Sequence, residues 1–284
     1  MKADYLVSKR SWIDPDLMGG RRPIVVPARD GTQLHGFLTL PKGAAGKNLP
    51  LVVNPHGGPF GIRDDWEWDL DPQLLASRGY AVLQINYRGS AGYGRRFRNA
   101  GKALWDSVMI DDISDAARWT VTQGYADPKR LCIYGGSYGG YAALASAERE
   151  PDLYRCTIGY AGVYDLPLFK RDSDISDTTS GRNYIDEFVG ATPERLAEAS
   201  PVNHVDKLKA AVLIVHGTQD KRAPFTQAKS LRKALEDRQY PFEWMEVAGE
   251  GHGFYAPENR KAFYEKLIGF LDQHIGSTAT AAAP

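Results

Sequence analysis

The sequence is poor in cysteine, carries no excess of either charge and contains no long apolar run. Only two of its 284 residues are cysteines, too few for the disulfide framework of a small secreted scaffold. Lys plus Arg equals Asp plus Glu at 35 each, which argues against nucleic acid or an anionic membrane as a partner. The longest apolar run, residues 210–215, is far shorter than the roughly 18 residues that cross a bilayer.

The amino terminus and the two cysteines bear on where the protein resides. Residues 1–5 lack the apolar core of a secretory signal peptide, so the sequence as it stands predicts a cytoplasmic protein. A periplasmic or secreted location follows instead if the chain is a fragment of a longer precursor. Cys132 and Cys156 fall in predicted core strands, and we expect both to be buried free thiols.

Short apolar runs alternate with helical patterns, which is typical of a parallel sheet covered by helices on both faces. The runs 23–28 and 33–40 are joined through Asp30-Gly31, which predicts an antiparallel hairpin at the start of the sheet. Later strands are expected at 51–54, 81–86, 131–134, 156–160, 211–216 and 242–247. Two of the expected helices cover 226–238 and 258–274. The sequence therefore predicts an α/β fold with a mostly parallel sheet of about eight strands.

Three segments depart from this alternation. Residues 1–22 resemble a linker that precedes a catalytic domain at 23–275, and we expect residues 276–284 to be disordered. Residues 165–201 are polar and charged, and they follow a core strand on the side where catalytic loops gather. This insertion is either a lid that faces the substrate or a surface excursion with two short helices, and the sequence leaves both open.

The stretch 131–147 predicts a nucleophile. An apolar strand leads into Gly135-Gly136-Ser137-Tyr138-Gly139, and an Ala-rich helix follows. This is the strand–turn–helix context of a nucleophile elbow, in which a serine stands on a sharp turn above a parallel sheet. The pentapeptide alone also fits an ordinary Gly-rich turn, but its flanking elements favour Ser137 as a nucleophile.

A serine nucleophile needs a base, and the base needs a carboxylate that orients it. Asp220 and His252 each follow a predicted strand, in the chain order Ser, Asp, His that this fold uses. We therefore expect Ser137, Asp220 and His252 to meet at the carboxyl edge of the sheet. The alternative acids are Asp165 and Glu250. The other histidines, which we interpret as structural or solvated, are His35, His204, His216 and His274, and His216 is interpreted as a turn residue at the end of its strand.

An oxyanion hole needs two N–H donors. The backbone of Tyr138, the residue after the nucleophile, is expected to supply one. The loop 56–59 follows an early strand and reads His-Gly-Gly-Pro. Because Pro59 has no N–H, the second donor is expected from Gly58 or Gly57, with Gly58 favoured.

No cofactor or metal is predicted. The stretch 135–140 lacks the lysine of a phosphate-binding loop, and no His/Cys spacing indicates zinc. Asp111, Asp112 and Asp115 lie in the first turns of a predicted helix, where acidic side chains interact favourably with the helix dipole.

The chain resembles the catalytic domain of the prolyl oligopeptidase family (peptidase family S9), nearest its acylaminoacyl-peptidase and dipeptidyl-peptidase-like branches, over about residues 21–275. The motifs that carry the resemblance are ARDG at 28–31, HGGP at 56–59, NYRGSAGYG at 86–94, YGGSYGGY at 134–141, HGTQD at 216–220 and GHGF at 251–254. The resemblance implies an α/β-hydrolase fold, a Ser137–His252–Asp220 triad and an oxyanion hole at the His56 loop. It also implies that Tyr87 and Arg88 support the floor of the site.

Members of this family usually carry an amino-terminal β-propeller that caps the active site, and residues 1–22 look like the segment that follows it. The chain is therefore expected to be either an excised catalytic domain or a stand-alone hydrolase.

The predicted function is a serine-type peptidase that cleaves peptide or acyl-amide bonds of short peptides through an acyl-enzyme. The alternative is a stand-alone carboxylesterase acting on small acyl esters. A hydrolase fold that serves only in protein interaction is disfavoured because each member of the triad is present.

Overall fold

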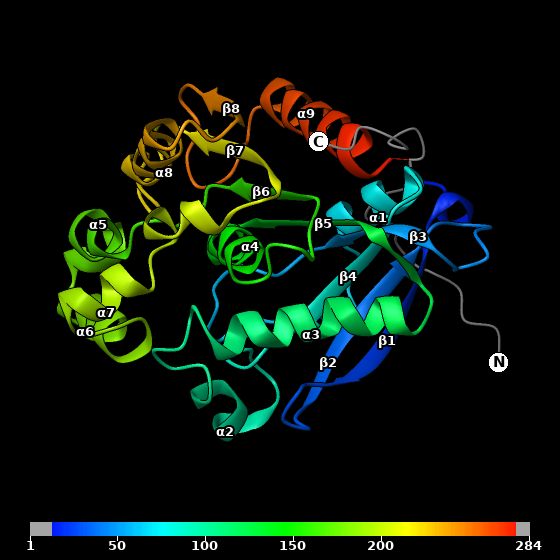
Figure 1. The fold of residues 1–284 in the computed structure, drawn as a ribbon, viewed down its shortest axis with the longest axis horizontal. Helices are drawn as coiled ribbons and strands as arrows, with labels where there is room; N and C mark the ends of the chain where they lie inside the picture. Colours follow the sequence, from blue (N-terminus) through cyan, green and yellow to red (C-terminus); the bar gives the residue numbers. More distant parts are fainter. Residues whose placement is uncertain (1–12, 277–284) are drawn as a thin grey trace, which may run out of the picture.

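The computed structural model describes residues 13–276 and centres on one eight-stranded sheet (Figure 1). The strand order is β1-β2-β4-β3-β5-β6-β7-β8. The strands are β1 (Gly20–Pro27), β2 (Gln33–Leu40), β3 (Leu49–Val53), β4 (Ala81–Asn86), β5 (Ala126–Gly136), β6 (Cys156–Tyr160), β7 (Ala211–Gly217) and β8 (Phe242–Val247). β1 pairs with β2 and β2 with β4 in antiparallel fashion, whereas all later pairs are parallel.

Helices cover both faces of the sheet. The α-helices are α1 (Leu70–Ser77), α2 (Gly94–Asn99), α3 (Val108–Thr122), α4 (Tyr138–Arg149), α5 (Leu166–Asp172), α6 (Thr179–Phe188), α7 (Pro193–Glu198), α8 (Thr226–Asp237) and α9 (Pro257–Ile275). Because side chains alternate along a strand, Val53 and Ile133 pack toward α3 and α4, whereas Val52 and Tyr134 pack toward α1 and α9. Strands buried on both faces explain the continuous apolar runs in the sequence.

The predicted α/β fold, with a mostly parallel sheet of eight strands, and the opening hairpin are confirmed. The amino-terminal boundary differs, because β1 begins at Gly20, inside the predicted linker 1–22. Two parts of the predicted termini lie outside the described residues: 1–12 of the linker and 277–284 of the tail. None of the helices in the described part of the chain has the length and apolar character needed to span a bilayer.

The expectation of two free thiols is wrong. Cys132 on β5 and Cys156 on β6 are register partners in adjacent parallel strands, and the structure joins them in a disulfide. Their Cα atoms are 4.7 Å apart, within the range that a disulfide bridges. Burial alone therefore did not decide the state of the thiols, since the strand register places them opposite one another.

The insertion at 165–201 contains three short α-helices, α5 to α7, rather than two. Its buried side chains, including Phe169 and Phe188, belong to the same apolar cluster as α3 and α4. In Figure 1 these helices form a layer beside the carboxyl end of the sheet. Whether the layer moves as a lid stays a prediction.

Candidate active site

Ser137 stands at the turn between β5 and α4, with φ 59° and ψ −123°. A positive φ is uncommon for a residue with a side chain, and it marks the sharp turn of a nucleophile elbow. A Cβ added to Gly135 would lie 2.6 Å from the backbone of Gly139, so glycine is required where the turn closes on itself. The N–H of Ser137 donates to the carbonyl of Tyr160 at 2.9 Å, which anchors the elbow to β6.

The structure brings Asp220 and His252 together from two loops at the same sheet edge. Nδ1 of His252 lies 2.8 Å from Oδ2 of Asp220. The other carboxylate oxygen accepts the N–H groups of Arg222 and Ala223, each at 2.9 Å. Burial on its own would raise the pKa of Asp220, but the hydrogen bonds from His216 and His252 outweigh it and lower that pKa to about 2. Asp220 is therefore an ionised, fixed acceptor for His252 at neutral pH.

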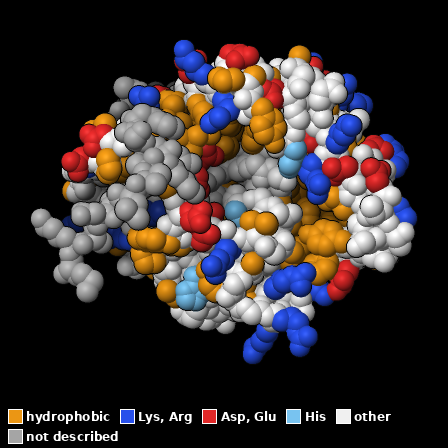
Figure 2. Space-filling model, turned by 180° about the vertical axis from the view of Figure 1, so that it is seen from behind, with side chains coloured by type: hydrophobic (Ala, Val, Ile, Leu, Met, Phe, Trp, Pro, Cys, Tyr) orange, Lys and Arg blue, Asp and Glu red, His pale blue; other side chains and the backbone are white. Residues whose placement is uncertain are grey.

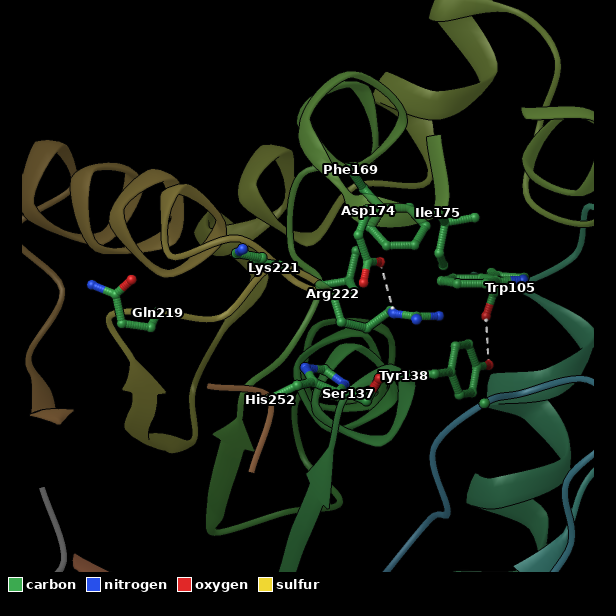
Figure 3. Close-up of a pocket in the computed structure, with 12 residues that line it drawn as sticks. Trp105, Ser137, Tyr138, Phe169, Asp174, Ile175, Gln219, Lys221, Arg222 and His252 are labelled. Carbon is green, nitrogen blue, oxygen red and sulfur yellow. Dashed lines mark hydrogen bonds and ion pairs between the residues drawn. The ribbon is translucent and has the colours of Figure 1, made fainter. Parts of the chain in front are cut away.

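Ser137 and His252 line the same cavity, which has a volume of about 490 Å³. Figure 3 shows the imidazole of His252 beside Ser137, at the base of this cavity. The three residues that the sequence predicted as a triad are thus gathered at one place from three separate loops. In space, the imidazole of His252 lies between the serine and the buried carboxylate, which is the order that a nucleophile, its base and the group that orients the base require.

The loop 56–59 packs directly against the elbow. A Cβ on Gly57 would lie 3.4 Å from Cβ of Ser137, and Gly58 lines the cavity together with Ser137 and Tyr138. The structure therefore places the predicted oxyanion donors Gly58, Gly57 and Tyr138 beside Ser137. Their role as donors is part of the proposal below.

A polar network under this loop was only partly foreseen. Nε2 of His56 lies 2.8 Å from Oγ of Ser90, and Tyr87 donates its hydroxyl hydrogen to the carbonyl of His56 at 2.7 Å. The rings of His56 and Tyr87 stack with centroids 4.4 Å apart. Burial lowers the pKa of His56 to about 4, with a hydrogen bond to Gly57 opposing the shift, so the imidazole is neutral at pH 7. Tyr87 therefore supports the floor of the site, as the resemblance implied, whereas the part of Ser90 was missed.

The cavity has an apolar wall that the sequence did not reveal. Trp105, Val163, Phe169 and Ile175 line it beside Tyr138. They come from the loop before α3, the loop after β6 and the insertion, and no spacing in the sequence connects them. Phe169 and Ile175 lie within the segment 165–201, so the sequence located that part of the wall but not its residues.

The mouth of the cavity is polar. Nε of Arg222 forms an ion pair with Oδ1 of Asp174 at 2.8 Å, which links the Asp220 loop to the insertion (Figure 3). Figure 2 shows hydrophobic side chains and charged side chains of both signs around a central hollow on one face of the molecule.

The alternative acids have other roles. Asp165 caps α5 by accepting the N–H of Leu168, and Oδ2 of Asp165 accepts the hydroxyl hydrogen of Ser230. Glu250 accepts the N–H groups of Tyr255 and Ala256 at 2.9 Å each, which closes the turn before α9. Neither contributes the carboxylate oxygen that contacts His252, which belongs to Asp220.

The other histidines differ from one another. His35 stacks on Tyr93, Nε2 of His204 contacts the carbonyl of Glu198, and the ring of His274 packs on Phe270. His216, interpreted from the sequence as a structural turn residue, instead lies fully buried in β7 with Nε2 3.3 Å from Oδ2 of Asp220. The interpretation as a turn residue is wrong because β7 extends through His216 to Gly217.

The three acidic residues of α3 form ion pairs with arginines, so their role goes beyond the predicted interaction with the helix dipole. Asp112 is fully buried and bound by Arg88, and Asp111 and Asp115 contact Arg29. Within residues 13–276, no three His, Cys, Asp or Glu side chains are arranged to hold a metal ion.

The comparison with protein families decides the affiliation of the chain. Residues 66–278 match the prolyl oligopeptidase family. The chain belongs to this family. The resemblance that the motifs indicated is therefore confirmed.

Individual relatives come from both predicted branches. Dipeptidyl aminopeptidase BIII of Pseudoxanthomonas mexicana is 36% identical over 280 residues, which covers 90% of this chain and 39% of that protein. The acylamino-acid-releasing enzyme of Rattus norvegicus is 28% identical over 237 residues, covering 81% and 32%. A solved Mycobacterium tuberculosis puromycin-hydrolyzing peptidase has a TM-score of 0.85 at 31% identity, covering 94% of this chain and 41% of that one.

The chain thus spans less than half the length of these relatives. The likenesses confirm the predicted fold and support the predicted serine peptidase function.

Proposed function

We propose that this domain hydrolyses peptide or acyl-amide bonds of short peptides through an acyl-enzyme formed on Ser137. The observation that carries the proposal is the 2.8 Å contact between Nδ1 of His252 and Oδ2 of Asp220, at the base of the cavity that also contains Ser137. Relatives that share this fold are named for dipeptidyl aminopeptidase and acylamino-acid-releasing activity, which are both amide-bond hydrolyses.

The roles follow from the geometry. Because Nδ1 of His252 faces a carboxylate, it carries the hydrogen, and Nε2 is free to accept the hydroxyl proton of Ser137. Ser137 Oγ then attacks the carbonyl carbon of the substrate. Asp220 fixes the tautomer of His252 and stabilises the imidazolium that forms.

The negative charge that develops on the substrate oxygen needs donors that are already in place. The backbone N–H of Tyr138 and that of Gly58 are assigned to it, with Gly57 as the alternative to Gly58. His252 then donates its proton to the leaving amine. Water, activated by the same imidazole, releases the acyl group and restores Ser137.

The cavity supports an apolar acyl side chain. Trp105, Val163, Phe169 and Ile175 offer a largely apolar wall next to Ser137, and burial of a side chain there adds binding energy in proportion to the apolar area covered. The substrate class proposed is therefore a short peptide or acylated amino acid with an apolar residue on the acyl side of the cleaved bond. The cytoplasmic location stays a prediction.

The test is a paired kinetic assay with p-nitrophenyl butyrate and with acetyl-alanyl and alanyl-prolyl p-nitroanilides. We expect anilide cleavage, a loss of at least about 10⁴-fold in Ser137→Ala, and unchanged unfolding of that variant. Ser77→Ala, at an exposed serine of α1, is the matched control and should keep full activity. Ester cleavage without anilide cleavage would favour the carboxylesterase, and full activity of Ser137→Ala would exclude the acyl-enzyme.

A further inference from the structure

Asp220 has a second histidine on the same carboxylate oxygen that His252 uses. Nε2 of His216 lies 3.3 Å from Oδ2 of Asp220, and Nδ1 of His252 lies 2.8 Å from it. His216 is fully buried near the end of β7, whereas His252 reaches the cavity. The carboxylate is therefore placed between a histidine that faces the substrate cavity and one that does not.

The contacts of His216 fix which of its nitrogens carries hydrogen. Nε2 of His216 also lies 2.8 Å from the backbone carbonyl of Ala223. A carbonyl and a carboxylate only accept hydrogen bonds, so Nε2 must be the donor, shared between Ala223 and Asp220. Nδ1 of His216 is buried and has no partner within residues 13–276. The N–H at Nε2 is thus the group through which the imidazole of His216 makes its polar contacts within the described residues.

That N–H completes the shell of the carboxylate. Oδ1 of Asp220 accepts the N–H groups of Arg222 and Ala223, and Oδ2 accepts those of His216 and His252. Each carboxylate oxygen therefore has two N–H groups next to it, so rotation of the carboxylate would break several of these contacts at once. An apolar residue at 216 would fill a similar volume without leaving a nitrogen unpartnered, but it would leave Oδ2 with a single donor.

We propose that His216 is a positioning residue, which holds Oδ2 of Asp220 toward His252 and shares the negative charge of that oxygen. The proposal rests on the triad proposed above. Each donor on Oδ2 weakens the pull of that oxygen on the other donor. Loss of the His216 donor should therefore leave more of the charge of Oδ2 to stabilise the imidazolium of His252, and it should hold Oδ2 less firmly in the position that aligns His252 with Ser137.

Lys221, the next residue along the chain, lines the cavity, and two other charged groups near Asp220 are engaged elsewhere. The guanidinium of Arg222 is paired with Asp174, and the carboxylate of Glu250 accepts from backbone groups of the turn before α9 and from Asn259. Tyr160 lies close by on β6, and burial raises the pKa of its hydroxyl, so it is uncharged over the working pH range. His216 and His252 are thus the titratable groups that contact the Asp220 carboxylate.

The test compares two substitutions of similar size. His216→Gln keeps an amide N–H near the position of Nε2, and His216→Leu removes the donor. We expect His216→Leu to move the acid limb of the kcat/KM–pH profile up by about 0.5 to 1 pH unit and to lower kcat about tenfold. His216→Gln should restore the wild-type acid limb and most of kcat. A purely structural role predicts an unshifted acid limb in both variants, and that result would overturn the proposal.

A second measurement covers the case in which the leucine variant does not fold. In wild-type protein labelled with ¹⁵N-histidine, the proposal requires the hydrogen of His216 on Nε2 at neutral pH, with the signal assigned by its loss in His216→Gln. A hydrogen on Nδ1 would overturn it. Failure of the triad itself would appear separately, as activity retained in Ser137→Ala, whereas failure of this inference leaves Ser137→Ala inactive.

Discussion

Gly139 in α4 faces the backbone carbonyl of Pro55, and a Cβ on Gly139 would collide with that oxygen. This approach joins the helix that follows Ser137 to the loop that carries Gly57 and Gly58. This one backbone contact therefore positions the two halves of the proposed oxyanion hole relative to each other. It leaves no room for a side chain at position 139.

Gly139→Ala is expected to push the loop 56–59 away from the elbow. Because the donors must lie within hydrogen-bond distance of the developing charge, kcat should fall at least about tenfold, with a destabilisation of about 1–3 kcal/mol. The matched control is Gly269→Ala in α9, where a Cβ meets nothing within 4 Å. That change should leave activity intact and stabilise the protein by about 0.5–1 kcal/mol. Kinetics and urea unfolding of both variants check the prediction, and equal effects would contradict it.

The bounds of β2, β4, β6 and β8 agree with the prediction. β4 and β6 are runs of buried residues, as expected of strands covered on both faces, whereas β2 and β8 are partly exposed and carry polar residues between the apolar ones. β5 begins at Ala126, whereas the prediction began at 131. The prediction started too late because Asp127 and Lys129, in the first half of the strand, are polar. Backbone pairing with β3, which shifts register between Leu49 and Leu51, extends that strand despite its polar sequence.

The site was predictable where chemistry depends on order along the chain, and not where it depends on tertiary packing. Ser137, Asp220 and His252 follow strands whose ends meet at one edge, so their encounter could be expected. His216 could not be separated from an ordinary turn residue, because its contact with Asp220 depends on how the loop after β7 folds back. Likewise, Asp112 looks like any acid in a first helical turn until β4 brings Arg88 against it.

The free energy of unfolding should depend on pH through the carboxylate of Asp220, whose pKa is lowered by its hydrogen bonds. The folded-state pKa of about 2 lies below the ordinary value of 3.8, so the ionised carboxylate stabilises the fold above about pH 4 by about 2 kcal/mol. This contribution is lost as the pH falls from about 4 through about 2. We expect the difference in unfolding free energy between wild type and Asp220→Asn to narrow over that range in urea titrations. A difference that stays constant between pH 7 and pH 2 would contradict the shift.

The pair Cys132–Cys156 makes a prediction that thiol titration can settle. Because the two residues are joined in a disulfide, unfolded and unreduced protein should show no thiol that reacts with Ellman's reagent, and both should react after reduction. Cys132→Ser is the control, since it leaves Cys156 without a partner and should show one reactive thiol before reduction. Two reactive thiols in unreduced wild type would instead restore the free-thiol prediction.

Arg88 and Asp112 form a buried ion pair that ties three elements together. Nε of Arg88 lies 2.9 Å from Oδ2 of Asp112, the N–H of Arg88 donates to the same oxygen at 2.8 Å, and the guanidinium also reaches Asp30 in the β1–β2 turn. Burial raises the pKa of Asp112, and the Arg88 contacts oppose that shift. The carboxylate therefore depends on the guanidinium to remain charged inside the protein.

Removing one partner should therefore cost more than removing both. Arg88→Met is expected to destabilise the protein by about 3–5 kcal/mol, because it leaves Asp112 buried without a cation, and Asp112→Leu in the same chain should recover most of that loss. Arg149→Met is the control, since Arg149 pairs with Asp111 near the surface and should cost at most about 1 kcal/mol. Urea unfolding at pH 7 of wild type, Arg88→Met, Asp112→Leu and the double variant gives the coupling energy, with Arg149→Met measured beside them. If Arg88→Met and Arg149→Met cost the same, the buried pair does not hold the hairpin turn, β4 and α3 together.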